Sequence, residues 1–364
     1  MENKNIICFD LEGPISLQDN AFEVMGLIKN GKRIFEVISR YDDILTLEGR
    51  ENYEPGDTLK LIVPFLIYHD ISEEDIRGIS DNASLTPGVE YTIHKLRDEG
   101  WRLYIISTSY EQHAYNIAER VGIPRERTFC TSLPLDELKT EMKEREAELI
   151  ENVENDILER LYLEMNDEMI KERLDRFYYR EINKTDFGNI INKISVVGGS
   201  RKVDAVIKIS NMNDKKISDM IAVGDSITDY KMLDFVRHND GISIVFNGND
   251  YAVPYANFGL ASPDMRFLLI ITSAYTNGGK SNVKRVVKRW ESDREKFEEN
   301  PEGIPKEFIP EHVRKFLIER KSEPGFMMPY LHNLEDADDE KIKSVVEIHR
   351  KFREFMRGEA AKLG

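Results

Sequence analysis

The sequence has few cysteines, no excess of basic residues and no long apolar run. Its two cysteines, Cys8 and Cys130, are too few for a disulfide framework or a cysteine-based zinc site. The 67 acidic residues outnumber the 51 basic ones, and the net charge of −16 would repel nucleic acid. The apolar run at 267–271 is too short to span a membrane, and the N-terminus shows no signal-peptide pattern. We therefore expect a cytoplasmic protein without nucleic-acid or membrane partners.

What the sequence does contain is an alternation of short apolar runs with helical patterns. The apolar runs have strand length, and amphipathic stretches of helical length lie between several of them. Such alternation is typical of βαβ units, so it predicts a doubly wound, Rossmann-like parallel sheet of the α/β class. The expected strands cover residues 5–9, 101–106, 128–131, 220–223 and 242–246, and the expected helices cover 89–99, 111–121, 202–210 and 229–235.

Two insertions interrupt this alternation, and a long extension follows it. The first insertion has mixed helical patterns and looks like a small insertion or cap, the second is helical in pattern, and the extension is charged, helical in pattern and punctuated by prolines. We expect the α/β core at 1–15, 85–134 and 195–272, a first cap insertion at 16–84, a helical second insertion at 135–194 and a helical C-terminal extension at 273–364.

The second insertion carries a regular apolar pattern. Between Leu149 and Met169 an apolar residue recurs at every fourth position, which predicts a long amphipathic helix or a helix pair. The pattern lacks the strict seven-residue repeat of a coiled coil, so packing on the chain's own domain is favoured over a dimer arm. A second copy of the chain, or a partner protein, would bind through this insertion or through the C-terminal extension.

Carboxylates follow two of the expected strands directly. Asp10 and Glu12 come after the apolar run that begins the chain, and Asp225 and Asp229 come after the run at 220–223. The carboxyl ends of parallel strands meet at one edge of the sheet, where open α/β folds bind their ligands. Carboxylate oxygens are the ligands that Mg²⁺ prefers, so the sequence predicts an acidic metal site assembled by the fold.

Other side chains suit phosphoryl chemistry at the same edge. Ser107 follows its strand directly and could donate a hydrogen bond to a phosphoryl oxygen, with Thr108 adding a further contact. Lys202 lies at a helix start and would hold a fixed positive charge beside a carboxylate nucleophile. Lys193 and Lys208 are less suitable, because both have the pattern of solvated helix lysines.

The arrangement of these residues resembles that of the haloacid dehalogenase-like hydrolase superfamily, and most nearly its phosphoserine-phosphatase-like branch. The likeness covers about residues 5–15, 85–133 and 195–262 and leaves the insertions and the extension outside. Most phosphatases of the superfamily carry Asp-x-Asp in the first motif, whereas this chain carries Asp-x-Glu. The four matching motifs are Asp10-Leu11-Glu12-Gly13, Ile105-Ile106-Ser107, Lys202 in Gly199-Ser200-Arg201-Lys202, and Gly224-Asp225-Ser226-Ile227-Thr228-Asp229.

The resemblance implies a role for each matching residue. Asp10 would be the nucleophile that forms an aspartyl-phosphate, and Glu12 would be the acid and base. Ser107, Thr108 and Lys202 would bind the phosphoryl group.

The resemblance also implies a Mg²⁺ ion as cofactor. Its ligands would be Asp10, Asp225 and the backbone carbonyl of Glu12. Asp229 would be a ligand itself, an outer partner of a ligand or an ion-pair partner of Lys202. The insertions would act as caps that select the substrate.

We therefore expect a Mg²⁺-dependent phosphatase that hydrolyses a small phosphorylated metabolite. A non-catalytic binding or accessory subunit of the same fold stays open, since Glu12 departs from the usual motif and the extension is long. A phosphotransferase or mutase, passing the phosphoryl group to an acceptor other than water, stays open too. Dehalogenation is disfavoured, because the dehalogenases of the superfamily lack both the acid at Glu12 and the metal at Asp225.

Overall fold

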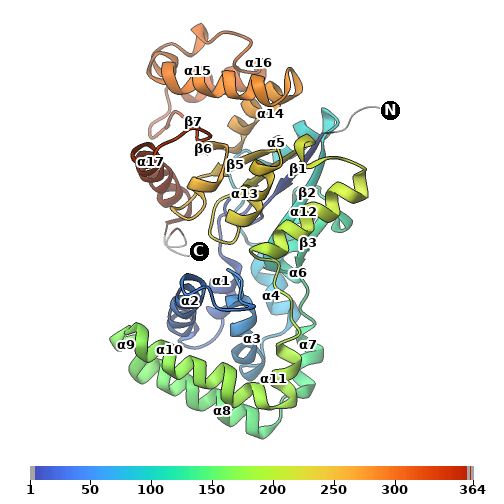
Figure 1. The fold of residues 1–364 in the computed structure, drawn as a ribbon, viewed down its shortest axis with the longest axis vertical. Helices are drawn as coiled ribbons and strands as arrows, with labels where there is room; N and C mark the ends of the chain where they lie inside the picture. Colours follow the sequence, from blue (N-terminus) through green and yellow to red (C-terminus); the bar gives the residue numbers. More distant parts are fainter. Residues whose placement is uncertain (1–4, 359–360, 362–364) are drawn as a thin grey trace.

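A seven-stranded sheet forms the centre of the computed structural model, which describes residues 5–358 and 361 (Figure 1). Residues 1–4 of the expected core and residues 359–360 and 362–364 of the expected extension lie outside the described residues. The strand order is β3-β2-β1-β4-β5-β6-β7, with β1 to β6 parallel and β7 antiparallel to β6. The strands are β1 Ile6–Phe9, β2 Arg102–Tyr110, β3 Thr128–Thr131, β4 Met220–Gly224, β5 Ile242–Phe246, β6 Phe258–Ala261 and β7 Tyr330–Asn333.

Helices cover both faces of this sheet, which confirms the doubly wound α/β architecture. Strand β1 is apolar at every position, as a strand buried on both faces must be. Its residues Ile7 and Phe9 pack into the core on one face, and Ile6 and Cys8 pack into the core on the other. The first face is covered by α5 Val89–Asp98, α6 Glu111–Arg120, α14 Leu268–Thr276, α15 Gly279–Glu299 and α16 Glu311–Arg320; the second is covered by α12 Ser200–Asn213, α13 Tyr230–His238 and α17 Asp339–Arg357.

The strand order reverses between β1 and β4. From β1 the chain winds outward through β2 to β3, and it then returns to the other side of β1 and winds through β4, β5 and β6. Phe9 pairs with Val223, so the segments that follow β1 and β4 leave the sheet at the same level. A reversal of this kind opens a crevice at the carboxyl ends of the two strands, where ligands bind in such folds.

The two insertions form one helical cap rather than two separate ones. Their buried apolar side chains belong to a common cluster, which lies below the sheet in Figure 1. The four-residue apolar pattern is broken at Met165, which has a φ of 44°, so this segment forms a helix pair packed on the chain's own helices. The cap helices are α1 Asn20–Met25, α2 Gly31–Leu47, α3 Thr58–Tyr68, α4 Glu73–Asp81, α7 Leu135–Leu138, α8 Glu144–Asp156, α9 Tyr162–Glu164, α10 Asp167–Arg176 and α11 Asp186–Ile191.

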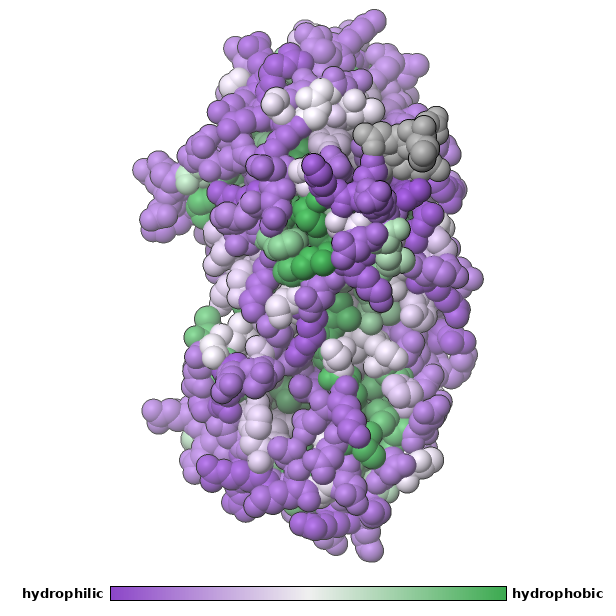
Figure 2. Space-filling model, turned by 45° about the vertical axis from the view of Figure 1, so that its right-hand side comes forward, coloured by the Kyte–Doolittle hydropathy of each residue, from purple (hydrophilic) through white to green (hydrophobic). Residues whose placement is uncertain are grey.

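The C-terminal extension is mostly helical, but it also adds a strand to the sheet. Strand β7 pairs with β6, and the sequence analysis predicted neither of these four-residue strands. Helix α17 lies at this end of the sheet, above the cap helix α2 in Figure 1. Figure 2 shows a largely hydrophilic face with small apolar patches around the middle of the molecule. No helix in the described part of the chain is both long enough and apolar enough to cross a bilayer.

Candidate active site

The acidic side chains expected at the strand ends lie together in the crevice. The backbone N–H of Asp10 donates to the carbonyl of Val223 at 2.8 Å, which fixes the end of β1 against β4. Asp10, Asp225 and Asp229 each offer a carboxylate oxygen within 4.8 Å of the others, and all three residues are buried. Residues more than 200 positions apart in sequence thus form one acidic cluster.

Lys202 neutralises part of this cluster from α12. Its ammonium group donates to Oδ1 of Asp10 at 2.8 Å and to Oδ1 of Asp229 at 2.6 Å, and its side chain is fully buried. Burial opposes the charge on the lysine, but the two carboxylates outweigh it and raise the pKa of Lys202. Lys193 and Lys208, the other lysines considered for this role, are exposed.

Asp229 organises the turn that carries Asp225. Its Oδ2 accepts hydrogen bonds from the backbone N–H of Asp225 at 2.9 Å and of Ser226 at 3.1 Å, while its Oδ1 accepts from Lys202. The turn packs tightly at Gly224, where an added Cβ would lie 2.6 Å from Cγ of Asp229. Both oxygens of Asp229 are therefore engaged, which favours an outer partner of the ligands over a direct ligand.

The geometry of Asp225 fits a divalent cation. Its Oδ1 is buried and has no hydrogen-bond partner among the described residues, and Asp225 belongs to the acidic cluster. The loop after β1 approaches it at Gly13, where an added Cβ would lie 2.4 Å from the carboxylate. Burial raises the pKa of Asp10 well above its ordinary range, and the charge of Asp229 raises it further. A cation among these oxygens would lower that pKa, and an oxygen-only donor set suits Mg²⁺.

Glu12 lies beside the cluster and is held by two hydrogen bonds. Its Oε1 accepts from the hydroxyl of Ser109 at 2.6 Å and from the backbone N–H of Asn20 at 3.0 Å. Desolvation raises the pKa of Glu12 to about 7, with the charge of Asp19 adding to the effect. A carboxyl group with this pKa can give and take a proton near neutral pH.

A cavity of about 80 Å³ lies between the strand ends and the cap. Thr108, rather than Ser107, is among the described residues that line it. Ser107 is fully buried, and its hydroxyl oxygen accepts from the backbone N–H of Ser109 at 3.0 Å. Of the residues singled out from the sequence, Asp10, Glu12, Thr108 and Asp225 line the cavity itself.

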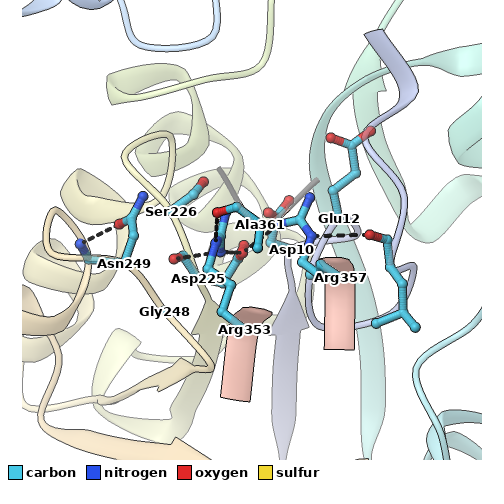
Figure 3. Close-up of polar contacts among 12 residues, drawn as sticks. Asp10, Glu12, Asp225, Ser226, Gly248, Asn249, Arg353, Arg357 and Ala361 are labelled. Atoms are coloured by element: carbon cyan, nitrogen blue, oxygen red, sulfur yellow. Dashed lines mark hydrogen bonds and ion pairs between the residues drawn. The ribbon is translucent and has the colours of Figure 1, made fainter. Parts of the chain in front are cut away.

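Two arginines at the site were missed by the sequence analysis. Arg353 and Arg357 of α17 both donate to Oδ2 of Asp225, the latter at 3.1 Å (Figure 3). Burial raises the pKa of Asp225, and the two guanidinium groups oppose that rise. The only local signal was a pair of arginines four residues apart on an amphipathic segment, and nothing in the sequence connected that pair with the acidic motifs.

Comparisons with known proteins found relatives over part or all of the chain. No family model matches the chain. A segment of 127 residues is 25% identical to the curated chloroplast phosphoserine phosphatase of Arabidopsis thaliana, covering 35% of this chain and 40% of that protein. The chain thus spans less than half the length of this curated relative.

Solved structures resemble this chain over a longer stretch. The structure of a gene product from Archaeoglobus fulgidus aligns over 100% of this chain and 99% of that one, with 26% identity and a TM-score of 0.78. A phosphoserine phosphatase in its apo form aligns over 73% of this chain and 98% of that one, with 15% identity and a TM-score of 0.47. The first likeness includes the insertions and the C-terminal extension, so the whole architecture recurs in another protein.

Proposed function

We propose that this protein is a Mg²⁺-dependent phosphatase that hydrolyses a small phosphomonoester through an aspartyl-phosphate on Asp10. The observation that carries the proposal is the convergence of Asp10, Asp225 and Asp229 on one buried point, with Lys202 bonded to two of them. A buried cluster of like charges is costly, and it persists in functional sites where a cation or a reaction requires it.

Asp10, Asp225 and the backbone carbonyl of Glu12 would hold the cation, with Asp229 behind them. The bound cation would cancel the repulsion between the phosphate and the carboxylates. Lys202 lowers the pKa of Asp10 against the effect of burial, and its hydrogen bond fixes the carboxyl group in place, as a nucleophile at the end of a strand requires.

The chain's own residues can carry both halves of the reaction. An oxygen of Asp10 forms a bond to phosphorus as the bond to the ester oxygen breaks, and the leaving oxygen takes a proton from Glu12. Glu12 then takes a proton from a water molecule, whose oxygen attacks the aspartyl-phosphate and releases phosphate with Asp10 restored. A carboxyl pKa of about 7 at Glu12 suits a group that must act first as an acid and then as a base.

The substrate would be small, because the cavity beside Asp10 has a volume of about 80 Å³. The cap contributes Phe35 and Asp42 of α2 and Thr58 and Leu59 of α3 to its lining. These side chains would contact the part of the substrate that leaves, so the cap would select among phosphomonoesters.

The test is a phosphate-release assay over a panel of phosphorylated metabolites, with and without Mg²⁺. Asp10→Asn should abolish turnover, because an amide is not a nucleophile toward phosphorus. Glu12→Gln should lower kcat about 10²- to 10⁴-fold, the usual contribution of a general acid or base. Asp98→Asn, at the exposed end of α5, is the matched control and should keep full activity.

Other outcomes would separate the rival functions. Turnover that persists in Asp10→Asn would contradict the mechanism. Tight Mg²⁺ and phosphate binding without turnover on any compound would favour a binding subunit. Product that forms only when an acceptor alcohol is added would favour a phosphotransferase.

A further inference from the structure

Helix α17 is tied to the loops that carry the acidic cluster. His349, Arg353 and Arg357 follow one another at four-residue intervals and therefore lie on one face of the helix. His349 Nδ1 accepts from the backbone N–H of Gly248 at 3.1 Å, in the loop after β5. Arg357 Nε donates to the carbonyl of Leu17 at 3.1 Å, in the loop after β1. The C-terminal extension thus packs against the crevice itself.

Both arginines reach the cavity from this face. Arg353 and Arg357 donate to Oδ2 of Asp225 (Figure 3). Both arginines line the cavity together with Asp10 and Thr108. Their side chains are buried, with 3% and 5% of their surface exposed. Solvent therefore screens their charges weakly, and any anion that enters the cavity would meet both of them.

The charges of the cluster explain why arginines would be needed there. Around a bound cation, the ionised carboxylates of Asp10, Asp225 and Asp229 would carry three negative charges, and Lys202 carries one positive charge. A divalent cation would bring that group to neutrality and no further. A phosphomonoester carries about two negative charges at neutral pH, so a neutral site would offer it no net attraction. Arg353 and Arg357 add the two positive charges that such a dianion requires.

We propose that Arg353 and Arg357 of the C-terminal extension form the anion-binding side of this site and receive the phosphoryl group of the substrate. This inference rests on the proposed function and adds to it that the extension is part of the active centre. A guanidinium group has five N–H donors, and Arg357 uses two of its nitrogens on Leu17 and Asp225. It can therefore contact a phosphoryl oxygen while it keeps Asp225 in place.

The experiment measures the binding of inorganic phosphate to the Mg²⁺-loaded full-length protein by calorimetry. A charge-assisted hydrogen bond is worth about 10- to 100-fold in affinity, so Arg357→Gln and Arg353→Gln should each weaken phosphate binding by about that factor. The conservative variants Arg353→Lys and Arg357→Lys should recover part of the loss. Arg350→Gln is the matched control, because Arg350 lies on the same helix but is exposed and pairs with Glu347. Its phosphate affinity should match that of the wild type.

The affinity for Mg²⁺ separates this role from a merely structural one. If the arginines receive the anion, their removal should leave Mg²⁺ binding unchanged or tighter, because it removes positive charge near the cation. Loss of Mg²⁺ and phosphate binding together, with a lower Tm and no rescue by lysine, would show that α17 only supports the fold. Tighter Mg²⁺ binding with unchanged phosphate affinity would show that α17 instead competes with the metal.

The same experiment distinguishes this inference from the proposed function. If the wild type hydrolyses phosphomonoesters and the glutamine variants bind phosphate as well as it does, only the inference about the arginines is overturned. A wild-type protein that binds Mg²⁺ and phosphate through these arginines without any turnover overturns the phosphatase and supports the anion site. A wild-type protein that binds no phosphate in the presence of Mg²⁺ overturns both.

Discussion

Lys202 offers a direct test of how the acidic cluster is stabilised. It is fully buried and is bonded to Asp10 at 2.8 Å and to Asp229 at 2.6 Å. Methionine has a similar length and keeps most of the apolar contacts of the lysine stem, so Lys202→Met chiefly removes the charge. The substitution would leave the carboxyl groups of Asp10 and Asp229 buried beside Asp225 without the ammonium group that lies between them.

The expected cost follows from the burial of these partners. Removing one member of a buried ion pair typically costs about 3–5 kcal/mol, because the other member is left charged in a weakly polar environment. Lys202 serves two carboxylates, but one of them can take up a proton, since burial already raises the pKa of Asp10. We therefore expect a loss of about 3–5 kcal/mol in unfolding free energy at pH 8.

The loss should depend on pH with a definite sign. Burial raises the pKa of Asp10 in the folded state and Lys202 opposes that rise, so without Lys202 the pKa of Asp10 lies still further above its value in the unfolded chain. The folded state then binds more protons than the unfolded state, so the stability of the variant falls as the pH rises. The gap between variant and wild type should thus be smaller at pH 5.5 than at pH 8.

Urea and thermal unfolding, followed by circular dichroism at both pH values, measure this gap. Lys208→Met is the matched control, because Lys208 is exposed on the same helix. Added Mg²⁺ should restore more stability to Lys202→Met than to the wild type, because the cation would replace the missing charge. A loss of less than about 1 kcal/mol at pH 8, or a gap that does not change with pH, would refute this account of the cluster.

Two further variants test other parts of the site. Gly13→Ala should weaken Mg²⁺ binding about 10- to 100-fold in calorimetry, because its Cβ would displace the Asp225 carboxylate 2.4 Å away. Gly100 also has a positive φ, but an added Cβ there would meet no described atom within 4 Å, so Gly100→Ala is the matched control. Equal losses of Mg²⁺ affinity in both variants would contradict displacement of Asp225 as the cause. Burial raises the pKa of Asp42 from 3.8 to about 7, so its ionisation lowers stability as the pH rises through that interval. Asp42→Asn, in which the amide oxygen still accepts the hydrogen bond from Tyr53, should therefore raise the unfolding free energy by up to about 4 kcal/mol at pH 8 and by little at pH 4. A gain that does not change with pH would contradict a raised pKa at Asp42.

Much of the core could be predicted from the sequence because its signals are local. A run such as Ile6–Phe9 is apolar at every position, which identifies a strand buried on both faces. The strands β6 and β7 were missed because each has only four residues, and β7 mixes polar with apolar side chains. Such short segments become strands by pairing with a neighbouring strand. The neighbour of β7 is β6, which lies far from it in the sequence.

The choice between Ser107 and Thr108 shows a similar limit at the site. Both hydroxyls follow the same apolar run, and the sequence favoured the first because it comes directly after the strand. In the structure β2 continues to Tyr110, and Thr108 lines the cavity while Ser107 is buried. The extent of a strand beyond its apolar run depends on its neighbours, so the side chain that reaches a cavity is settled by packing.

The sequence by itself determined which acidic residues follow the strands and at which edge of the sheet they emerge. Apolar runs ending in Asp10 and Asp225 follow rules of burial and strand topology that act over a few residues. Only the tertiary structure joined the two insertions into one cap and brought Arg353 to Asp225 across 128 positions. Contacts between residues so far apart depend on how whole helices pack. The local sequence around Arg353 therefore does not indicate a contact with Asp225, and the sequence around Asp225 does not indicate one with Arg353.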